Sequence, residues 1–243
     1  MRVAVVSDIH GNLHALEAVL ADIDAGAAVD ELWCLGDVVG YGPRPNECCD
    51  LIRERAALSL CGNHDLAVLG TLDTSEFSGD AAVAARWTAG VLGDEQRQWL
   101  ASLEPLARRA DTQLFHASPR DPVWEYVLSE QAAVVALLET DAPVVLVGHS
   151  HVALALAWDG SAVEGGLVPG GTTTELGGRR WLINPGSVGQ PRDGDARAAW
   201  LLLDTDALSG SFRRVPYPVE RTQEEIRDRQ LPEALADRLA HGI

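Results

Sequence analysis

The stretch that decides the fold is Val3-Ala-Val-Val-Ser-Asp-Ile-His-Gly-Asn12. Residues 3–6 are apolar and mostly β-branched, which predicts a short buried strand. Side chains two residues apart on an extended chain project to the same face. Asp8 and His10 are therefore expected to point together beyond the sheet edge, where open α/β sheets bind ligands. The pair predicts two metal ligands; an aspartate that caps a helix and a surface histidine are the alternative.

The composition predicts a folded protein with an acidic surface. The chain has 243 residues, of which 47% are apolar, and no linker, low-complexity tract or internal repeat divides it. We therefore expect a single domain over residues 1–243. The formal net charge of −17 argues against a long nucleic acid as the main partner. A small phosphorylated ligand remains compatible, because bound metal ions would supply a local cationic centre.

Neither a targeting segment nor a membrane partner is expected. The N-terminal apolar run is too short for a signal peptide, and no stretch approaches the roughly 20 apolar residues of a membrane helix. No C-x-x-C spacing occurs among the cysteines, which are Cys34, Cys48, Cys49 and Cys61. Buried, reduced thiols and a cytoplasmic location are therefore expected.

The first half of the chain alternates strands with helices. Apolar residues recur at helical spacing over 13–23, with Asn12 as a candidate N-cap, and a second strand is predicted over 31–35. This strand–helix–strand unit implies a parallel pair with a right-handed crossover. Another helix is predicted to end at residue 55, and a further helix, capped by Ser129, is predicted to run to about residue 139. Further strands are predicted over 58–61, 112–116 and 144–147.

The second half is mostly β. Strands are predicted over 152–158, 172–176, 180–183, 199–203 and 212–215, and two helices over 219–229 and 232–240. The pattern favours two packed sheets with helices outside. Residues 66–105 contain two predicted helices, over 81–89 and 95–103, with Asp94 as a candidate cap of the second. We interpret this segment as a lid or substrate-shaping insertion, and residues 219–243 as C-terminal helices.

Histidines gather at the predicted strand ends. Five of the seven lie there: His10, His64, His116, His149 and His151. Asp8, Asp37 and Asn63 share this location. Such a mixture of carboxylate, imidazole and amide ligands suits Mn²⁺, Fe²⁺, Zn²⁺ or Ni²⁺. It exceeds the needs of one tetrahedral ion, so we infer two ions, which can clamp a phosphate and activate a hydroxide for in-line attack.

The ordered motifs resemble those of the calcineurin-like metallophosphoesterase superfamily. They are Asp8-x-His10, Gly36-Asp37, Gly62-Asn-His-Asp65, His116 and Gly148-His-x-His151. The loop 41–47 and the segment 184–190 resemble the small single-domain bacterial and archaeal branch. The resemblance implies a four-layer α/β/β/α sandwich, with two mixed sheets and a dinuclear metal site at the sheet edge.

The resemblance also assigns roles to individual residues. It implies that the first metal is held by Asp8, His10, Asp37 and His151, and the second by Asp37, Asn63, His116 and His149, so that Asp37 bridges them. His64, which should turn away from the direction of Asn63, would contact the phosphate and protonate the leaving oxygen. Asp65 either orients His64 or is an acidic residue at a helix N-terminus.

Other candidate substrate residues each have a structural alternative. Asn12 can contact substrate or cap its helix, and Tyr41 can stack on a base or pack. Arg192 can bind a distal phosphate or pair with the acidic residues that follow it. Three more residues that can line a pocket or belong to the core or rim are Arg120, Trp124 and Tyr126.

The function that these patterns favour is hydrolysis of a small phosphodiester or nucleotide by a metal-dependent enzyme. A phosphomonoesterase, including a protein phosphatase, and a dinucleoside polyphosphate hydrolase are the enzymatic alternatives, because the same motifs build their core. A catalytically silent binding scaffold is the alternative from another class. It is disfavoured because no ligand position is replaced.

Overall fold

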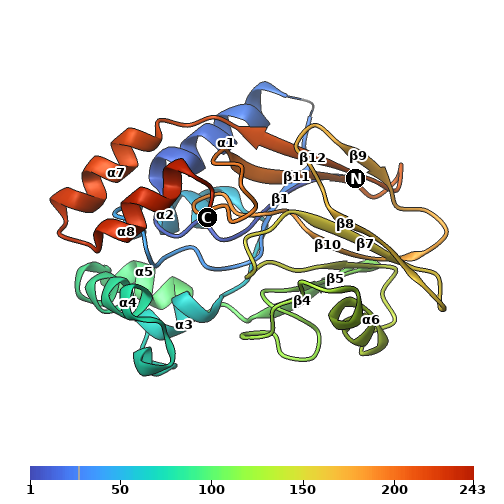
Figure 1. The fold of residues 1–243 in the computed structure, drawn as a ribbon, viewed down its shortest axis with the longest axis horizontal. Coiled ribbons are helices and arrows are strands. Elements are labelled where there is room, and N and C mark those ends of the chain that lie inside the picture. Colours follow the sequence, from blue (N-terminus) through green and yellow to red (C-terminus); the bar gives the residue numbers. More distant parts are fainter. Residues whose placement is uncertain (27) are drawn as a thin grey trace.

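Two six-stranded sheets form the centre of the molecule (Figure 1). The computed structural model describes residues 1–26 and 28–243. The first sheet has the order β3 (Leu58–Ser59), β2 (Glu31–Cys34), β1 (Arg2–Val6), β11 (Ala198–Asp204), β12 (Ser209–Val215) and β9 (Thr173–Glu175). The second has the order β4 (Leu106–Arg109), β5 (Thr112–Phe115), β6 (Val144–Leu146), β10 (Arg180–Asn184), β7 (Leu154–Trp158) and β8 (Val163–Leu167).

Both sheets are mixed. The pairs β1–β2 and β2–β3 are parallel in the first sheet, as are β5–β6 and β6–β10 in the second, and the remaining pairs are antiparallel. The parallel pairs place the C-terminal ends of β1 and β2 side by side in the first sheet, and those of β5 and β6 side by side in the second. The predicted fold class is thereby confirmed.

Alternation along β1 creates two separate cores. Val3 and Val5 pack between the sheets with residues such as Leu146 and Phe212, whereas Ala4 and Val6 face helices on the outside. Helices α1 (Leu13–Ala25) and α2 (Pro45–Arg55) cover the first sheet, and α6 (Glu130–Leu138) covers the second. The order helix, sheet, sheet, helix gives the four expected layers.

The other helices gather at one end of the sandwich, on the left of Figure 1. They are α3 (Asn63–Val68), α4 (Gly79–Val91), α5 (Asp94–Leu100), α7 (Val219–Asp228) and α8 (Glu233–Asp237), with 3₁₀ turns at Thr74–Glu76 and Arg238–Ala240. A small apolar cluster joins α4 to α7 and α8 through Ala84, Ile226 and Leu235. Asp94, predicted as the cap of α5, is its first residue, and the N-cap is Gly93.

Two strands escape prediction from the sequence, and both lie at edges. β4 carries two arginines, and β8 contains Gly165 and Gly166, so neither shows the apolar alternation of a half-buried strand. Cross-strand pairing with β5 and β7 nevertheless holds them in the second sheet.

Two other expectations from the sequence concern the cysteines and membrane-spanning helices. All four cysteines are free and buried. Within residues 1–26 and 28–243, no helix has the length and apolar character needed to cross a membrane.

Replacement of Phe212 by alanine is expected to lower the free energy of unfolding by about 3–5 kcal/mol, because it leaves a cavity between the sheets. Phe212 is 2% exposed, whereas Leu167 on edge strand β8 is 70% exposed. The control Leu167→Ala should change stability by less than about 0.5 kcal/mol. Equilibrium denaturant unfolding of both variants measures the difference, and equal losses would contradict this packing.

Candidate metal centre

Left-handed turns beyond the strands, rather than the strands themselves, present the candidate ligands. β1 ends at Val6 and β6 ends at Leu146, before the ligand residues begin. Positive φ angles occur at Asp8 (53°), His10 (51°), Asp37 (52°), His149 (61°) and His151 (60°). The argument that alternate residues of an extended chain share a face is therefore wrong here, although the side chains do converge.

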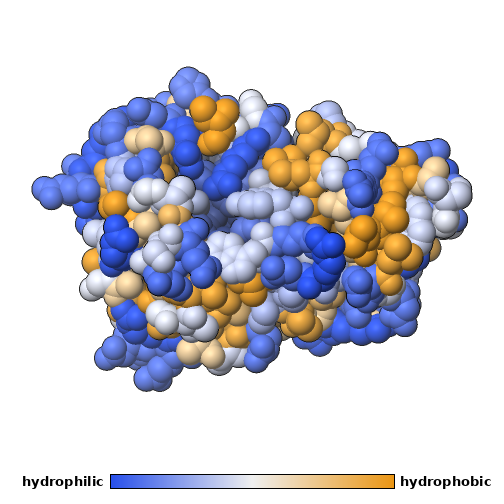
Figure 2. All heavy atoms as spheres, turned by 60° about the horizontal axis from the view of Figure 1, so that its bottom comes forward, coloured by the Kyte–Doolittle hydropathy of each residue, from blue (hydrophilic) through white to orange (hydrophobic). Residues whose placement is uncertain are grey.

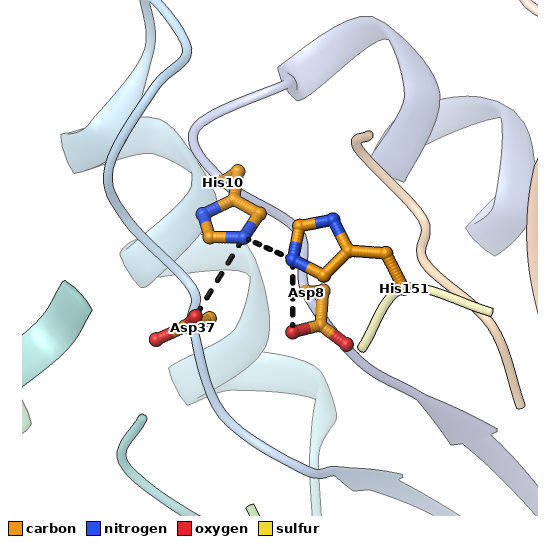
Figure 3. Close-up of side chains that lie close together, drawn as sticks. All are labelled: Asp8, His10, Asp37 and His151. Carbon is orange, nitrogen blue, oxygen red and sulfur yellow. Dashed lines mark hydrogen bonds and ion pairs between the residues drawn. The ribbon is translucent and has the colours of Figure 1, made fainter. Parts of the chain in front are cut away.

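The convergence produces two groups of buried donor atoms that share Asp37. In the first group one ligand atom from each of Asp8, His10, Asp37 and His151 lies within 4.8 Å of the others (Figure 3). The second group joins Asp37, His116 and His149 by the same criterion. Oδ1 of Asn63, the first residue of α3, lies 3.2 Å from Nε2 of His116. All seven predicted ligands therefore meet in one place.

Hydrogen bonds fix which ring nitrogens are free. Nδ1 of His10 lies 3.0 Å from the carbonyl oxygen of Val39, and Nδ1 of His151 lies 2.7 Å from that of Gln190. A carbonyl oxygen only accepts, so both Nδ1 atoms carry the proton and both Nε2 atoms present lone pairs. These two Nε2 atoms are 3.0 Å apart. A cation between them turns this repulsion into attraction.

The second group is oriented in the same way. Nδ1 of His116 donates to the carbonyl oxygen of Leu35 (2.9 Å), which leaves its Nε2 as a donor of electrons. Nε2 of His149 lies 3.2 Å from the carbonyl oxygen of Trp124, which leaves Nδ1 free. Nε2 of His116 is 3.5 Å from Oδ2 of Asp37. This Oδ2 is buried and has no hydrogen-bond partner among the described residues.

Burial keeps the metal-free cluster close to neutral. It raises the pKa of Asp8 to about 7 and that of Asp37 well above its usual range. It lowers the pKa of His116 to about 4 and that of His149 to about 3. Neutral imidazoles and desolvated carboxylates are the donor set of a divalent transition metal, so the residues fit such ions.

Comparison with known proteins identifies the family. The family model of the calcineurin-like phosphoesterase superfamily domain matches residues 1–207. The chain belongs to this family. It is thus a metal-dependent phosphoester hydrolase, and the resemblance expected from the motifs is confirmed.

Individual relatives agree with this assignment. A metallophosphoesterase from Sphaerobacter thermophilus is 43% identical, and its crystal structure matches with a TM-score of 0.91 over 100% of this chain and 99% of that one. A protein of unknown function from Methanocaldococcus jannaschii is 38% identical over 99% of this chain and 98% of that protein. A symmetrical bis(5'-nucleosyl)-tetraphosphatase from Actinobacillus pleuropneumoniae is 38% identical over 74 residues, which are 30% of this chain and 27% of that enzyme.

Gly62 explains why the phosphoesterase motif starts with glycine. A Cβ atom at this position would overlap Oδ1 of Asp37 and would lie 2.6 Å from Cε1 of His116. The backbone at Gly62 therefore passes between two ligands of the second group. No side chain larger than hydrogen fits there without displacing them.

His64 and Asp65 follow Asn63 but have different surroundings. The ring of His64 packs edge-on against His10, with ring centroids 4.8 Å apart, and its buried Nδ1 has no partner in the described part of the chain. The carboxylate of Asp65 accepts hydrogen bonds from the backbone of Gly62 (2.9 Å) and Val39 (3.0 Å). It serves as a backbone anchor at the start of α3, so the prediction that it orients His64 is not supported.

The candidate substrate residues separate into two sets. Oδ1 of Asn12 caps α1 by accepting from the amide of Ala15 (3.3 Å), and its Nδ2 donates to the carbonyl oxygen of Gly189 (2.8 Å). These bonds occupy the Asn12 side chain, which is 1% exposed, so substrate contact is not supported. Tyr41 and Arg192, by contrast, line a cavity of about 310 Å³ beside the ligands.

Further residues line the same cavity, which opens on the face drawn in Figure 2. Trp124 and Tyr126, which the sequence places either at a pocket or in the core and rim, line it together with Phe77. Arg120 instead pairs with Glu125. Arg192 does not pair with the acidic residues that follow it: it donates to Oε1 of Gln190 (2.8 Å) and contacts the hydroxyl of Tyr41 (3.4 Å).

Several supporting residues cannot be recognised from the sequence. Ser187 donates to the carbonyl oxygen of Asp8 (2.7 Å), and Nδ2 of Asn184 donates to that of Gly148 (2.7 Å). These bonds tie the segment after β10 to the turns that carry the ligands. In the sequence, only the resemblance of segment 184–190 to the family points to Asn184 and Ser187.

Titration of the metal-free protein with Mn²⁺ at about pH 6 is expected to release protons. At this pH Asp8, whose pKa burial raises to about 7, is mostly protonated, whereas a carboxylate ligand must be ionised. The site histidines have lowered pKa values and carry no extra proton to lose.

Calorimetry in buffers of different ionisation enthalpy measures the number of protons released. The number should fall as the pH rises above about 8, and it should be smaller for Asp8→Asn. Proton release that is absent at about pH 6, or that grows with pH, would contradict the assigned ligands.

Proposed function

We propose that this phosphoesterase hydrolyses a small phosphodiester with two divalent metal ions. Asp8, His10, Asp37 and His151 would hold the first ion, and Asp37, Asn63, His116 and His149 would hold the second. The observation that carries this proposal is the membership of Asp37 in both donor groups. Its buried Oδ2, which has no hydrogen-bond partner among residues 1–26 and 28–243, lies 3.6 Å from Nε2 of His10 and 3.5 Å from Nε2 of His116. The nitrogen and oxygen donors are compatible with Mn²⁺, Fe²⁺, Zn²⁺ or Ni²⁺.

The bound ions would supply charge stabilisation for the phosphate oxygens and a nucleophile at neutral pH. The protein would contribute a proton through His64, which lines the cavity beside the ligands. Burial and the charge of Arg192 lower the pKa of His64. A phosphate anion next to the ring acts in the opposite direction, so substrate binding would favour the protonated ring that donates to the leaving oxygen.

Arg192 would bind the substrate anion from within the cavity. Among the residues that the structure describes, it is the only arginine or lysine that lines this cavity, and the hydrogen bond to Gln190 holds its guanidinium in place. A cation confined to the cavity, on a chain of net charge −17, favours a small phosphorylated partner over a long nucleic acid.

We further propose that residues 1–243 act as one unit in which segment 66–105 shapes the cavity. Phe77 and Ala81 from this segment line it, and α4 packs against α7 and α8. A cytoplasmic location is supported by four free cysteines, all of them buried.

Hydrolysis of a dinucleoside polyphosphate is the second candidate. The observation that favours it is the similarity to bis(5'-nucleosyl)-tetraphosphatases, whose matches cover between 28% and 65% of this chain. A phosphomonoesterase or protein phosphatase would need the same ligands. A silent scaffold remains disfavoured, because every predicted ligand is present and converges.

His116→Ala is expected to lower kcat/KM for bis(p-nitrophenyl) phosphate at least about 100-fold, because it removes a ligand of the second group. Metal analysis should show less bound metal, while circular dichroism stays unchanged. His241→Ala is the matched control, since His241 is exposed and outside the site. Turnover of His116→Ala equal to that of the control would refute the proposal.

His64→Gln is expected to slow substrates with poor leaving groups more than those with good ones, because a proton donor matters most for an alkoxide. The comparison uses two methyl phosphodiesters, one with p-nitrophenol and one with a simple alcohol as the leaving group. Equal metal content is verified in the wild type and in His64→Gln. An equal loss on both substrates would argue against His64 as the general acid.

A further inference from the structure

We propose that three aromatic side chains at the mouth of the cavity bind the planar base of a nucleoside phosphate. The three residues, which we call the aromatic wall, are Phe77, Trp124 and Tyr126. This inference rests on the proposed function, because it assigns the group that the phosphoester carries. It narrows the substrate class to esters with a flat aromatic ring.

A continuous series of ring contacts connects the candidate metal ligands to this wall. His64 packs edge-on against His10 on one side and against Phe77 on the other, with centroids 4.8 and 4.9 Å apart. Phe77 then meets Trp124 edge-on at 5.2 Å. One ring, that of His64, therefore lies between the candidate ligand His10 and Phe77 of the wall. A phosphate at the ligands would place its substituent against the wall.

Tyr126 forms the other end of the wall, above the second group of ligands. Its ring stacks on His149 with centroids 4.1 Å apart and planes inclined by 21°. It remains 48% exposed, and Phe77 and Trp124 are also partly exposed. Aromatic rings of low polarity that stay open to a cavity are surfaces on which a base can stack.

The aromatic residues are concentrated here although the chain has few of them. Aromatic residues make up 5% of the chain, with seven tryptophans, three tyrosines and three phenylalanines. Four of them, Tyr41, Phe77, Trp124 and Tyr126, line this one cavity. They come from opposite halves of the sandwich: Phe77 follows the turn Thr74–Glu76, whereas Trp124 and Tyr126 lie between β5 and α6.

The loop that carries Trp124 is already ordered. Oδ1 of Asp121 accepts hydrogen bonds from the amides of Val123 and Trp124, both 3.1 Å long. Glu125 contacts Ser118 and Arg120. A preformed wall loses little conformational entropy when a ligand binds.

The lining of the cavity combines two kinds of group that fit a nucleotide. Arg192 and several candidate metal ligands line it together with the aromatic wall. A nucleoside phosphate has an anion at one end and a flat ring at the other, so it matches both kinds of group. A sugar phosphate without a base would leave the wall unused.

The test compares AMP with ribose 5-phosphate, which differ only by the base. Isothermal titration calorimetry of the Mn²⁺-loaded protein measures both affinities, and released phosphate is assayed in the same samples. We expect AMP to bind about 5- to 150-fold more tightly, the range of one base stacked on an aromatic side chain.

Trp124→Ala and Phe77→Leu should reduce the ratio of the two affinities toward one. Phe77→Leu keeps an apolar side chain at this position, so it still tests the aromatic wall if Trp124→Ala fails to fold. Leu128→Ala is the matched control, because Leu128 lies in the same loop, is 58% exposed and does not line the cavity. Its ratio should equal that of the wild type.

Equal affinities of the wild type for AMP and ribose 5-phosphate, or a ratio that survives in both wall variants, would overturn the aromatic wall as a base site. A preserved base preference without hydrolysis of any phosphodiester would support the base site and overturn the proposed reaction.

Discussion

Two imidazole nitrogens that face each other without a proton between them set the requirements for the rest of the structure. Nε2 of His10 and Nε2 of His151 lie 3.0 Å apart, and backbone carbonyl groups hold both Nδ1 protons on the far side of the rings. One buried oxygen each of Asp8 and Asp37 lacks a partner within the described residues. Repulsion among these donors is relieved by cations, so the site is built for ions.

The sandwich stores backbone strain to keep these donors together. In the described part of the chain, nine non-glycine residues have a positive φ. Six of these are Tyr41 and the five candidate ligands with positive φ given above. Such a conformation costs on the order of 1–3 kcal/mol per residue and persists only where neighbouring structure enforces it. Backbone hydrogen bonds enforce it here: the amide of Asp8 donates to Gly36 (3.0 Å), and that of His10 donates to Asp37 (2.9 Å). The turn after β1 is thereby fastened to the turn after β2.

The acidic surface and the polar site are complementary rather than contradictory. The formal net charge of −17 keeps extended anions away from the molecule, while Arg192 gives the cavity a cation beside the donor groups. The helices α3 and α4 and the loop before α6 close around this cavity from the two halves of the sandwich. These connections therefore supply much of the cavity lining, whereas most of the candidate donor groups lie in turns that follow the strands.

The sequence by itself determined the strands that are buried, the βαβ start and the identity of the donors, because apolar periodicity and residue chemistry are local properties. It did not reveal β4 and β8, whose edge positions place few demands on composition. Tertiary structure alone decided how the donors converge, since left-handed φ values at Asp8 and His149 depend on hydrogen bonds from distant segments. Tertiary structure also decided that the side chains of Asn12 and Asp65 hydrogen-bond to backbone groups, whereas the side chain of Arg192 lines the cavity. These roles depend on which partners occupy each polar atom, and those partners are up to 210 residues away along the chain.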